Sequence, residues 1–452
     1  MRRKRLTTIG SVAILIALWQ LVAISVDQPE LLPTVPRLLS TIGESIASIS
    51  FYRAILSTMS RILICLAISL FASFVMAILF SRFKLIYELF RPTLAIMRSI
   101  PVISFILLAL IFLNNENIPL MIGFLTMFPL LTENLTKGMQ SLNPSLTMMA
   151  KMFNIGRRNR LMLVIYPQIA PFLYSGLTSA AGFGWRAIIM GEVLAQCSFG
   201  IGSEMKMAQN LIDVPTLLAW TIVAILMSYI FDKGIGRLSA VRCDVSFLKR
   251  DCYGHISKHI TNITANNIGY HYGVEQFSHQ FQHGMVYGLS GPSGRGKTTL
   301  LNMIGGILNP IHGSVEPTIN DGISFVFQEP DLLPWLSAKE NVALPLSSIM
   351  KHESAMSRAM IYLRMMGIED LAERLPKEMS YGQQQRVAIA RALSFPSPIL
   401  LMDEPFKGLD IAIRQHIINS IKDIQQNEKR VIIFTSHSPE ELSSLADEVI
   451  YL

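Results

Sequence analysis

Residues 291–299 read Gly-Pro-Ser-Gly-Arg-Gly-Lys-Thr-Thr, which matches the phosphate-binding pattern G-x-x-x-x-G-K-[ST] without a mismatch. A short apolar run at 285–290 predicts a buried strand before this loop, and residues 298–308 predict a helix after it. In such a loop the backbone N–H groups turn toward phosphate oxygens, and the helix N-terminus adds partial positive charge. The sequence therefore predicts a nucleotide site that contains Gly291, Ser293, Gly294, Gly296, Lys297, Thr298 and Thr299.

A second motif lies downstream, where residues 399–404 read Ile-Leu-Leu-Met-Asp-Glu. The four apolar residues predict a buried strand, and the strand end is a rigid place to hold two carboxylates near the phosphate loop. We expect Lys297 to reach the β- and γ-phosphates of ATP, and Thr298 and Asp403 to hold Mg²⁺. Glu404 is then the expected catalytic group that polarises the attacking water.

Further motifs follow in the order found in the nucleotide-binding domain of ABC transporters, which this part of the chain resembles. Gln328 stands in a motif like the Q-loop, residues 379–383 (Met-Ser-Tyr-Gly-Gln) resemble the signature motif, residues 408–410 resemble the D-loop, and His437 resembles the switch histidine. The resemblance implies that Gln328 contacts Mg²⁺ and senses the permease. It also implies that His437 contacts the γ-phosphate, so both are expected catalytic residues.

The same resemblance adds residues that bind nucleotide from outside the phosphate loop. In ABC transporters the signature motif faces the ATP held by a partner subunit, which implies this role for Ser380 and Gly382. Gln383 and the D-loop residue Asp410 join them in the expected nucleotide-binding set. Tyr272 is placed like the aromatic residue that stacks on adenine, with Tyr270 as the neighbouring alternative.

Two positions depart from the family pattern. Tyr381 stands where the signature motif usually has glycine, and Lys407-Gly408 is not the commonest D-loop sequence. The following signature glycine, Gly382, is present, so we expect hydrolysis at a full or reduced rate.

The first half of the chain has the composition of a membrane protein. The 452-residue chain is 51% hydrophobic and only 16% charged, whereas ordinary globular domains carry about a quarter charged residues. Residues 1–240 contain 20 Lys and Arg against 10 Asp and Glu, and residues 241–452 contain 19 against 22. Because basic residues beside apolar segments orient membrane proteins, the net charge of +7 does not indicate nucleic-acid binding.

Six apolar segments predict membrane-crossing helices, because about 20 apolar residues span the hydrocarbon core. Lys and Arg gather at the N-terminus and after the second, fourth and sixth segments, which places both termini and the second half of the chain in the cytoplasm. The first segment also resembles a signal peptide, but its apolar run is long, so we favour a retained helix. The segments lie at about 8–26, 57–80, 93–113, 118–135, 169–195 and 214–231.

Residues 1–240 resemble the permeases of nitrate, sulfonate and taurine importers, a class that includes carriers of thiamine precursors. The similarity runs through residues 32–33, 98–101 (Arg-Ser-Ile-Pro) and 182–192. The loop at 146–167 resembles the coupling loop of importers, although the usual acidic residue is missing and Asn154 replaces a glycine. Asn tolerates the left-handed conformation, so we expect the turn to form. The alternative is a basic amphipathic loop that rests on the lipid surface.

The predicted fold class is a multidomain protein. An all-α six-helix transmembrane permease domain (1–240) and a linker (241–262) precede an α/β P-loop ABC ATPase domain (263–452). A phosphate loop and a signature motif in one such domain are too far apart to serve the same ATP, so the simplest complete machine is a homodimer. The expected function is import of a small solute across the bacterial cytoplasmic membrane with a separate binding protein. The alternatives are an exporter and a regulatory ATP-binding membrane protein with little turnover.

Two groups of side chains leave alternatives open. Arg186 and Glu192 lie within the fifth segment, where ionisable residues line a translocation path or form structural pairs. Four potential metal ligands lie close together near the linker, but their spacing fits no standard zinc finger, so we favour a plain connector. These four are Cys243, Cys252, His255 and His259.

Overall fold

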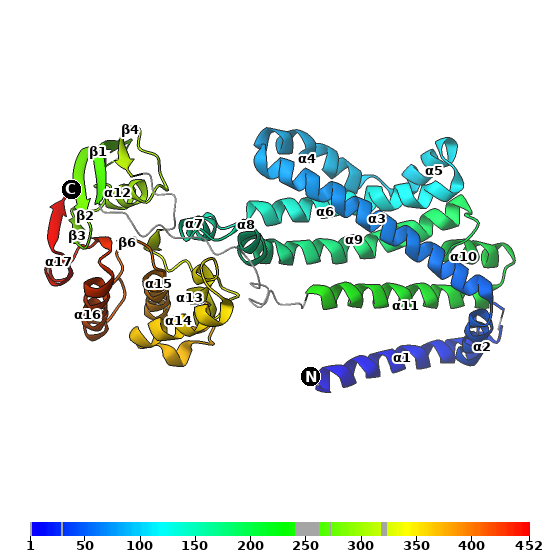
Figure 1. Cartoon of the computed structure of the whole chain (residues 1–452). Coiled ribbons are helices and arrows are strands. Elements are labelled where there is room, and N and C mark those ends of the chain that lie inside the picture. Colours follow the sequence, from blue (N-terminus) through cyan, green and yellow to red (C-terminus); the bar gives the residue numbers. More distant parts are fainter. Residues whose placement is uncertain (1, 29, 240–261, 272, 318–322) are drawn as a thin grey trace. The chain divides into compact units, whose positions relative to one another are not determined.

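A computed structural model describes residues 2–28, 30–239, 262–271, 273–317 and 323–452 (Figure 1). The chain divides into two compact units. The first contains residues 1–142 and 168–242, and the second contains residues 143–167 and 243–452. Residues 241–261 of the predicted linker, with the four potential zinc ligands, lie outside the described residues.

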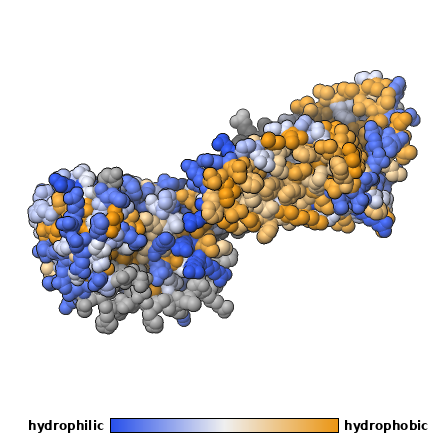
Figure 2. Space-filling view, turned by 90° about the horizontal axis from the view of Figure 1, so that it is seen from above, coloured by the Kyte–Doolittle hydropathy of each residue, from blue (hydrophilic) through white to orange (hydrophobic). Residues whose placement is uncertain are grey.

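The described part of the first unit is helical. Apolar side chains from several helices form its core, including Cys65, Met127, Trp185 and Trp220. Figure 2 shows a broad apolar surface over this unit, bounded by hydrophilic residues. The helices are α1 (Arg2–Val26), α2 (Val35–Ile46), α3 (Ile49–Arg82), α4 (Lys84–Ser99), α5 (Val102–Phe112), α6 (Ile118–Gln140), α9 (Tyr166–Ala195), α10 (Ile201–Asn210) and α11 (Val214–Ser239), with a 3₁₀ turn η1 (Asn115–Asn117).

The described residues do not confirm the six membrane-crossing helices that were predicted. Among the described residues, four helical segments are long and apolar enough to cross a membrane, and the bent pair α4–α5 makes a fifth if it is one span. A shorter apolar helix, Ala13–Val26, corresponds to the first predicted segment. The first unit is therefore a multi-helix membrane domain, for which the count of six is not confirmed.

The third predicted segment, 93–113, is not one continuous helix. Helices α4 and α5 are bent by 92° at the break between them. Ile100 is extended, with ψ 132°, because the ring of Pro101 disfavours the helical conformation in the residue before it. Proline also lacks the N–H that would continue the helical ladder.

Glu192 has a structural partner inside the first unit. Its side chain is fully buried, and its carboxylate accepts hydrogen bonds from Arg61 Nη1 at 2.7 Å, Thr58 Oγ1 at 2.9 Å and the Gly202 N–H at 3.0 Å. Arg61 Nη2 also pairs with Glu116 at 2.5 Å. This network joins α3, α9 and the start of α10. Of the two alternatives for Glu192, a translocation path or a structural pair, the contacts therefore favour the structural pair. Arg186 instead lines a cavity of about 510 Å³ with Trp185, Tyr229 and Asp232.

The second unit contains two sheets. The five-stranded sheet is parallel, in the order β5-β6-β7-β3-β8, and the three-stranded sheet is antiparallel, in the order β2-β1-β4. β6 and β7 are buried throughout, as expected for parallel strands covered on both faces. The strands are β1 (Asn262–Tyr270), β2 (Val274–Gln282), β3 (Val286–Ser290), β4 (His312–Glu316), β5 (Ser324–Val326), β6 (Ile399–Asp403), β7 (Val431–Thr435) and β8 (Glu448–Tyr451).

Helices α12, α15 and α17 contact strands of the parallel sheet, and α13, α14 and α15 pack on one another as a helical layer (Figure 1). The helices are α12 (Lys297–Ile304), α13 (Ala338–Leu346), α14 (His352–Met365), α15 (Tyr381–Ser394), α16 (Ile411–Glu428) and α17 (Pro439–Leu445), with 3₁₀ turns η4 (Glu369–Leu371) and η5 (Pro376–Glu378). This is the α/β fold expected of the second half.

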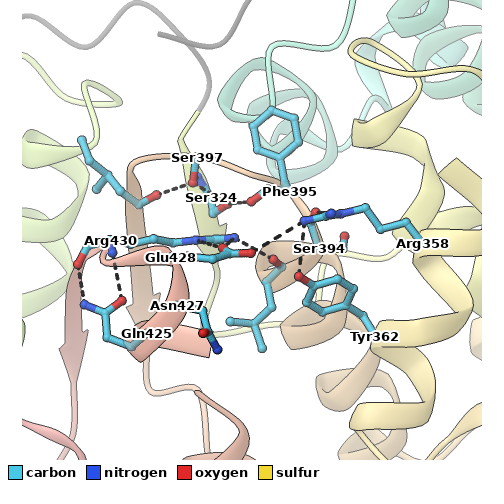
Figure 3. A network of polar contacts seen from close by, with 12 residues as sticks. Ser324, Arg358, Tyr362, Ser394, Phe395, Ser397, Gln425, Asn427, Glu428 and Arg430 are labelled. Atoms are coloured by element: carbon cyan, nitrogen blue, oxygen red, sulfur yellow. Dashed lines mark hydrogen bonds and ion pairs between the residues drawn. The ribbon is translucent and has the colours of Figure 1, made fainter. Parts of the chain in front are cut away.

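A polar network connects α14 to the ends of α15 and α16 (Figure 3). Arg358 of α14 donates to the carbonyl oxygen of Ser394 at 2.8 Å, and its guanidinium lies 3.9 Å from the carboxylate of Glu428. Arg430 is buried, pairs with the same carboxylate, and donates to the carbonyl oxygen of Leu393 at 3.0 Å. The ends of α15 and α16 are thereby fixed to α14.

The segment that resembles a coupling loop belongs to the second unit. It contains α7 (Pro144–Met152), α8 (Arg157–Asn159) and a π-helical turn η2 (Arg160–Ile165). Asn154 has a left-handed φ of 49°, as its side chain permits. The preceding Phe153 is fully buried, and its ring meets that of Phe395 edge-on at 5.6 Å. Trp335 Nε1 donates to the carbonyl oxygen of Leu163 at 2.8 Å. The segment therefore forms part of the core of the second unit.

Candidate nucleotide-binding and hydrolysis site

The site forms where three neighbouring parallel strands end at one edge of the sheet. The register aligns Leu289 of β3 with Thr435 of β7, and Thr435 with Asp403 of β6. The residues that follow these strands therefore meet at the carboxyl edge, where open α/β sheets bind their ligands.

The phosphate loop adopts a conformation that requires glycine. Gly296 has a φ of 84°, and a Cβ on it would stand 2.7 Å from the carbonyl carbon of Gly273. Helix α12 begins directly afterwards at Lys297, whose side chain is buried. Its ammonium group donates to the carbonyl oxygens of Gly291 at 2.7 Å and Pro292 at 3.0 Å. A positive charge and the N-terminus of a helix thus face the same loop, which suits a bound phosphate.

Three oxygen-bearing side chains form a chain of hydrogen bonds beside α12. Thr298 Oγ1 donates to Asp403 Oδ2 at 2.8 Å. Thr435 Oγ1 donates to Asp403 Oδ1 at 2.7 Å and accepts from the backbone N–H of Glu404 at 2.9 Å. Asp403 is therefore fixed through both of its carboxylate oxygens.

Glu404 and His437 lie side by side. His437 Nε2 is 3.3 Å from Glu404 Oε1. Glu404 has a left-handed φ of 46°, a conformation uncommon for a residue with a side chain. Strained backbone of this kind concentrates at functional sites.

These groups surround one cavity of about 310 Å³. It is lined by the predicted residues Ser293, Gly294, Gly296, Lys297, Thr298, Thr299, Gln328, Asp403, Glu404 and His437. Among the described residues, the lining does not include Ser380, Gly382, Gln383 or Asp410. Tyr272, the predicted adenine contact, lies outside the described residues.

The signature motif forms the start of α15, outside this cavity. Ser380 Oγ accepts from the Gln383 N–H at 3.3 Å, and Gln383 Oε1 accepts from the Ser380 N–H at 2.8 Å. This capping box satisfies backbone groups at the helix N-terminus. Asp410 occupies the equivalent N-terminal position of α16.

Sequence reasoning missed two contributions to the site. Thr435 holds Asp403 and Glu404, and the only signal for it was a polar residue that ends an apolar strand just before His437. Arg391 of α15 is fully buried and donates to the carbonyl oxygens of Pro330 at 2.9 Å and Asp331 at 2.8 Å, just after Gln328. Its guanidinium also lies over the Phe153 ring at 5.6 Å, so it connects the segment at 143–167 to the residues that follow Gln328.

Two family models match this chain. The ABC transporter model matches residues 274–407, and the model for the binding-protein-dependent transport system inner membrane component matches residues 69–238. The first match covers most of the second unit's phosphate site, and the second covers much of the helical unit.

Individual proteins are similar to the second half. The thiamine import ATP-binding protein ThiQ of Shigella flexneri serotype 5b is 40% identical over 187 residues, which cover 39% of this chain and 81% of that protein. ThiQ of Escherichia coli K12 is 38% identical over 187 residues, which again cover 39% of this chain and 81% of that protein. A dimeric structure of the ATP-binding cassette MJ0796 bound to ADP and Pi is 32% identical, with a TM-score of 0.39, and covers 42% of this chain and 94% of that one.

Proposed function

Because this chain belongs to the ABC transporter family, as a fusion of a permease and an ATP-hydrolysing domain, we propose that it imports a small solute across the bacterial cytoplasmic membrane. The permease domain would comprise residues 1–240, joined by residues 241–262 to a nucleotide-binding domain at 263–452. Both termini and the ATPase would lie in the cytoplasm, and a separate binding protein would deliver the solute.

One observation supports a homodimer. The phosphate loop, Glu404 and His437 line one cavity, and Ser380 and Gly382 of the same chain do not line it. A second copy, facing the first head to tail, would bring its own signature motif to this cavity, and two-fold symmetry would complete two identical ATP sites.

The residues of the cavity fit ATP with Mg²⁺. Lys297 and the N-terminus of α12 would bind the phosphates. The Thr298 hydroxyl and the Asp403 carboxylate lie 2.8 Å apart, and hydroxyl and carboxylate oxygens are the ligands that Mg²⁺ prefers, with Gln328 as the third candidate. The bound metal would neutralise charge on the phosphates. Glu404 would orient and polarise the attacking water, and His437 would contact the γ-phosphate. Tyr272 is proposed to stack on adenine.

Coupling to the membrane domain is proposed to run through the segment 143–167. This segment joins α6 to α9 in the chain, and its Phe153 contacts Arg391, which holds the Q-loop carbonyls. A shift of the Q-loop on ATP binding would therefore be transmitted to α6 and α9.

The solute path is proposed to include the cavity beside Arg186. Its volume is about 510 Å³, within the range of small-molecule sites. Arg186 would favour an anionic group and Asp232 a cationic one, and the rings of Trp185 and Tyr229 would favour a ring in the solute. The relatives named above are thiamine import proteins, so thiamine and pyrimidine precursors are candidates beside sulfonates and nitrate.

The test is uptake in cells that make this protein together with a candidate binding protein. A labelled panel of sulfonates, nitrate, thiamine and pyrimidines is offered to cells with the wild type or with Glu404→Gln. Accumulation of one compound that disappears in the variant supports the proposal. If the protein is made and reaches the membrane, but no compound accumulates in a Glu404-dependent way, the result counts against import and favours the exporter or the regulatory protein.

A further inference from the structure

Tyr381, the residue that departs from the signature pattern, contacts the Q-loop of its own chain. Its hydroxyl donates a hydrogen bond to the carbonyl oxygen of Gln328 at 3.0 Å. Tyr381 is the first residue of α15, and Gln328 lines the ATP cavity. The start of the signature helix is thus attached to the rim of the chain's own nucleotide site.

The second departure from the family pattern makes room for this contact. Gly408 of the D-loop has a φ of 73°, and a Cβ on it would stand 3.0 Å from Cδ1 of the Tyr381 ring. Gly382 packs on the same segment, since a Cβ there would stand 3.0 Å from the carbonyl oxygen of Gly408. Tyr381 and Gly408 are therefore complementary changes, in which the ring occupies space that a larger D-loop residue would fill.

Helix α15 holds the Q-loop at two places. Tyr381 binds the carbonyl of Gln328, and Arg391 binds the carbonyls of Pro330 and Asp331. Burial, together with the nearby carboxylates of Glu329 and Glu404, raises the pKa of the Tyr381 hydroxyl, so it stays protonated and able to donate at neutral pH. The helix and the Q-loop can then move as one body.

We propose that Tyr381 is a positioning residue that links the two ATP sites of the homodimer. Its hydrogen bond ties the Q-loop of the chain's own site to the signature helix that this chain presents to the partner's ATP. Nucleotide binding at one site therefore shifts the helix that completes the other. This inference rests on the proposed homodimeric transporter.

The experiment measures steady-state ATP hydrolysis against ATP concentration, with the full-length protein in lipid nanodiscs. Tyr381→Phe removes the hydroxyl and keeps the ring over Gly408. Tyr362→Phe is the matched control, because the Tyr362 hydroxyl accepts a 3.3 Å hydrogen bond from Arg358 Nη2, and neither residue lines the nucleotide cavity. Thermal unfolding of each preparation verifies the fold.

Tyr381→Phe is expected to lower kcat about two- to tenfold, which is the fold-change that corresponds to the loss of one hydrogen bond. It is also expected to move the Hill coefficient of hydrolysis toward 1. The KM for ATP is expected to stay within about twofold, because the phosphate loop is untouched. Tyr362→Phe should match the wild type in kcat and Hill coefficient.

Three results would overturn the inference: an unchanged kcat and Hill coefficient in Tyr381→Phe, an equal loss in Tyr362→Phe, or a wild type that hydrolyses ATP with a Hill coefficient of 1. A wild type that does not hydrolyse ATP at all would instead overturn the proposed function.

Discussion

Truncation of Phe153 is expected to separate ATP hydrolysis from transport. Phe153 is fully buried between Phe395 and the guanidinium of Arg391, and it belongs to the segment that joins α6 to α9. Removing a fully buried phenylalanine side chain costs about 3–5 kcal/mol. The lost contacts are those that hold the segment at 143–167 against Phe395 and Arg391. Phe153→Ala should therefore release this segment from α15. Phe153→Leu keeps most of the apolar volume and should cost less than about 1.5 kcal/mol.

The assay compares basal ATP hydrolysis with hydrolysis stimulated by solute and binding protein, alongside uptake, in proteoliposomes. Phe153→Ala should keep basal hydrolysis within a few-fold of wild type and lose both the stimulation and the uptake, whereas Phe153→Leu should keep all three. The reasoning is refuted if Phe153→Ala retains the wild-type ratio of stimulated to basal hydrolysis. Loss of basal hydrolysis together with stimulation would show that Phe153 supports the fold of the ATPase instead.

Three further predictions concern ATP binding, the buried ion pair and pH. Lys297→Ala should weaken binding of a fluorescent ATP analogue about tenfold to a hundredfold, since it removes charge-assisted hydrogen bonds to phosphate; an affinity equal to wild type would contradict the site. Arg61→Ala leaves Glu192 buried without its cation, so a loss of about 3–5 kcal/mol should appear as a lower unfolding temperature in detergent, which the exposed Arg53→Ala should not show. Burial raises the pKa of Asp331 from 3.8 to about 6, so the stability contributed by its protonated form is present below about pH 4 and is lost as pH rises through about 6. Asp331→Asn should therefore raise the unfolding temperature more at pH 7.5 than at pH 4.5, and an equal gain at both values would contradict this.

The sequence was enough to predict that many of the residues lining this cavity lie close together, because several of them follow short apolar strands. Parallel strands of similar length end at the same edge, so the phosphate loop and the carboxylates after 399–402 were expected to meet. The left-handed turn at Asn154, with φ 49°, was expected because Asn154 stands where the similar importer loops have glycine and because Asn tolerates this conformation.

Contacts between residues that are distant in the sequence could not be predicted from local sequence patterns. The pairing of Arg61 with Glu192 joins residues 131 positions apart, and no local pattern specifies which helix faces which. The role of Thr435 depends on the register of β6 against β7. The 92° bend between α4 and α5 had a local signal in Pro101, but the apolar pattern continued across it and predicted one helix.

The most direct measurement of the central claim is the direction of ATP-driven transport in proteoliposomes. With ATP enclosed, only molecules whose ATPase faces inward are active, and labelled solute with the binding protein is added outside. The account predicts accumulation inside the vesicles, with loss of the initial rate by a factor of about 10²–10⁴ in Glu404→Gln. Expulsion of preloaded solute under the same conditions, or accumulation that persists in Glu404→Gln, would contradict it.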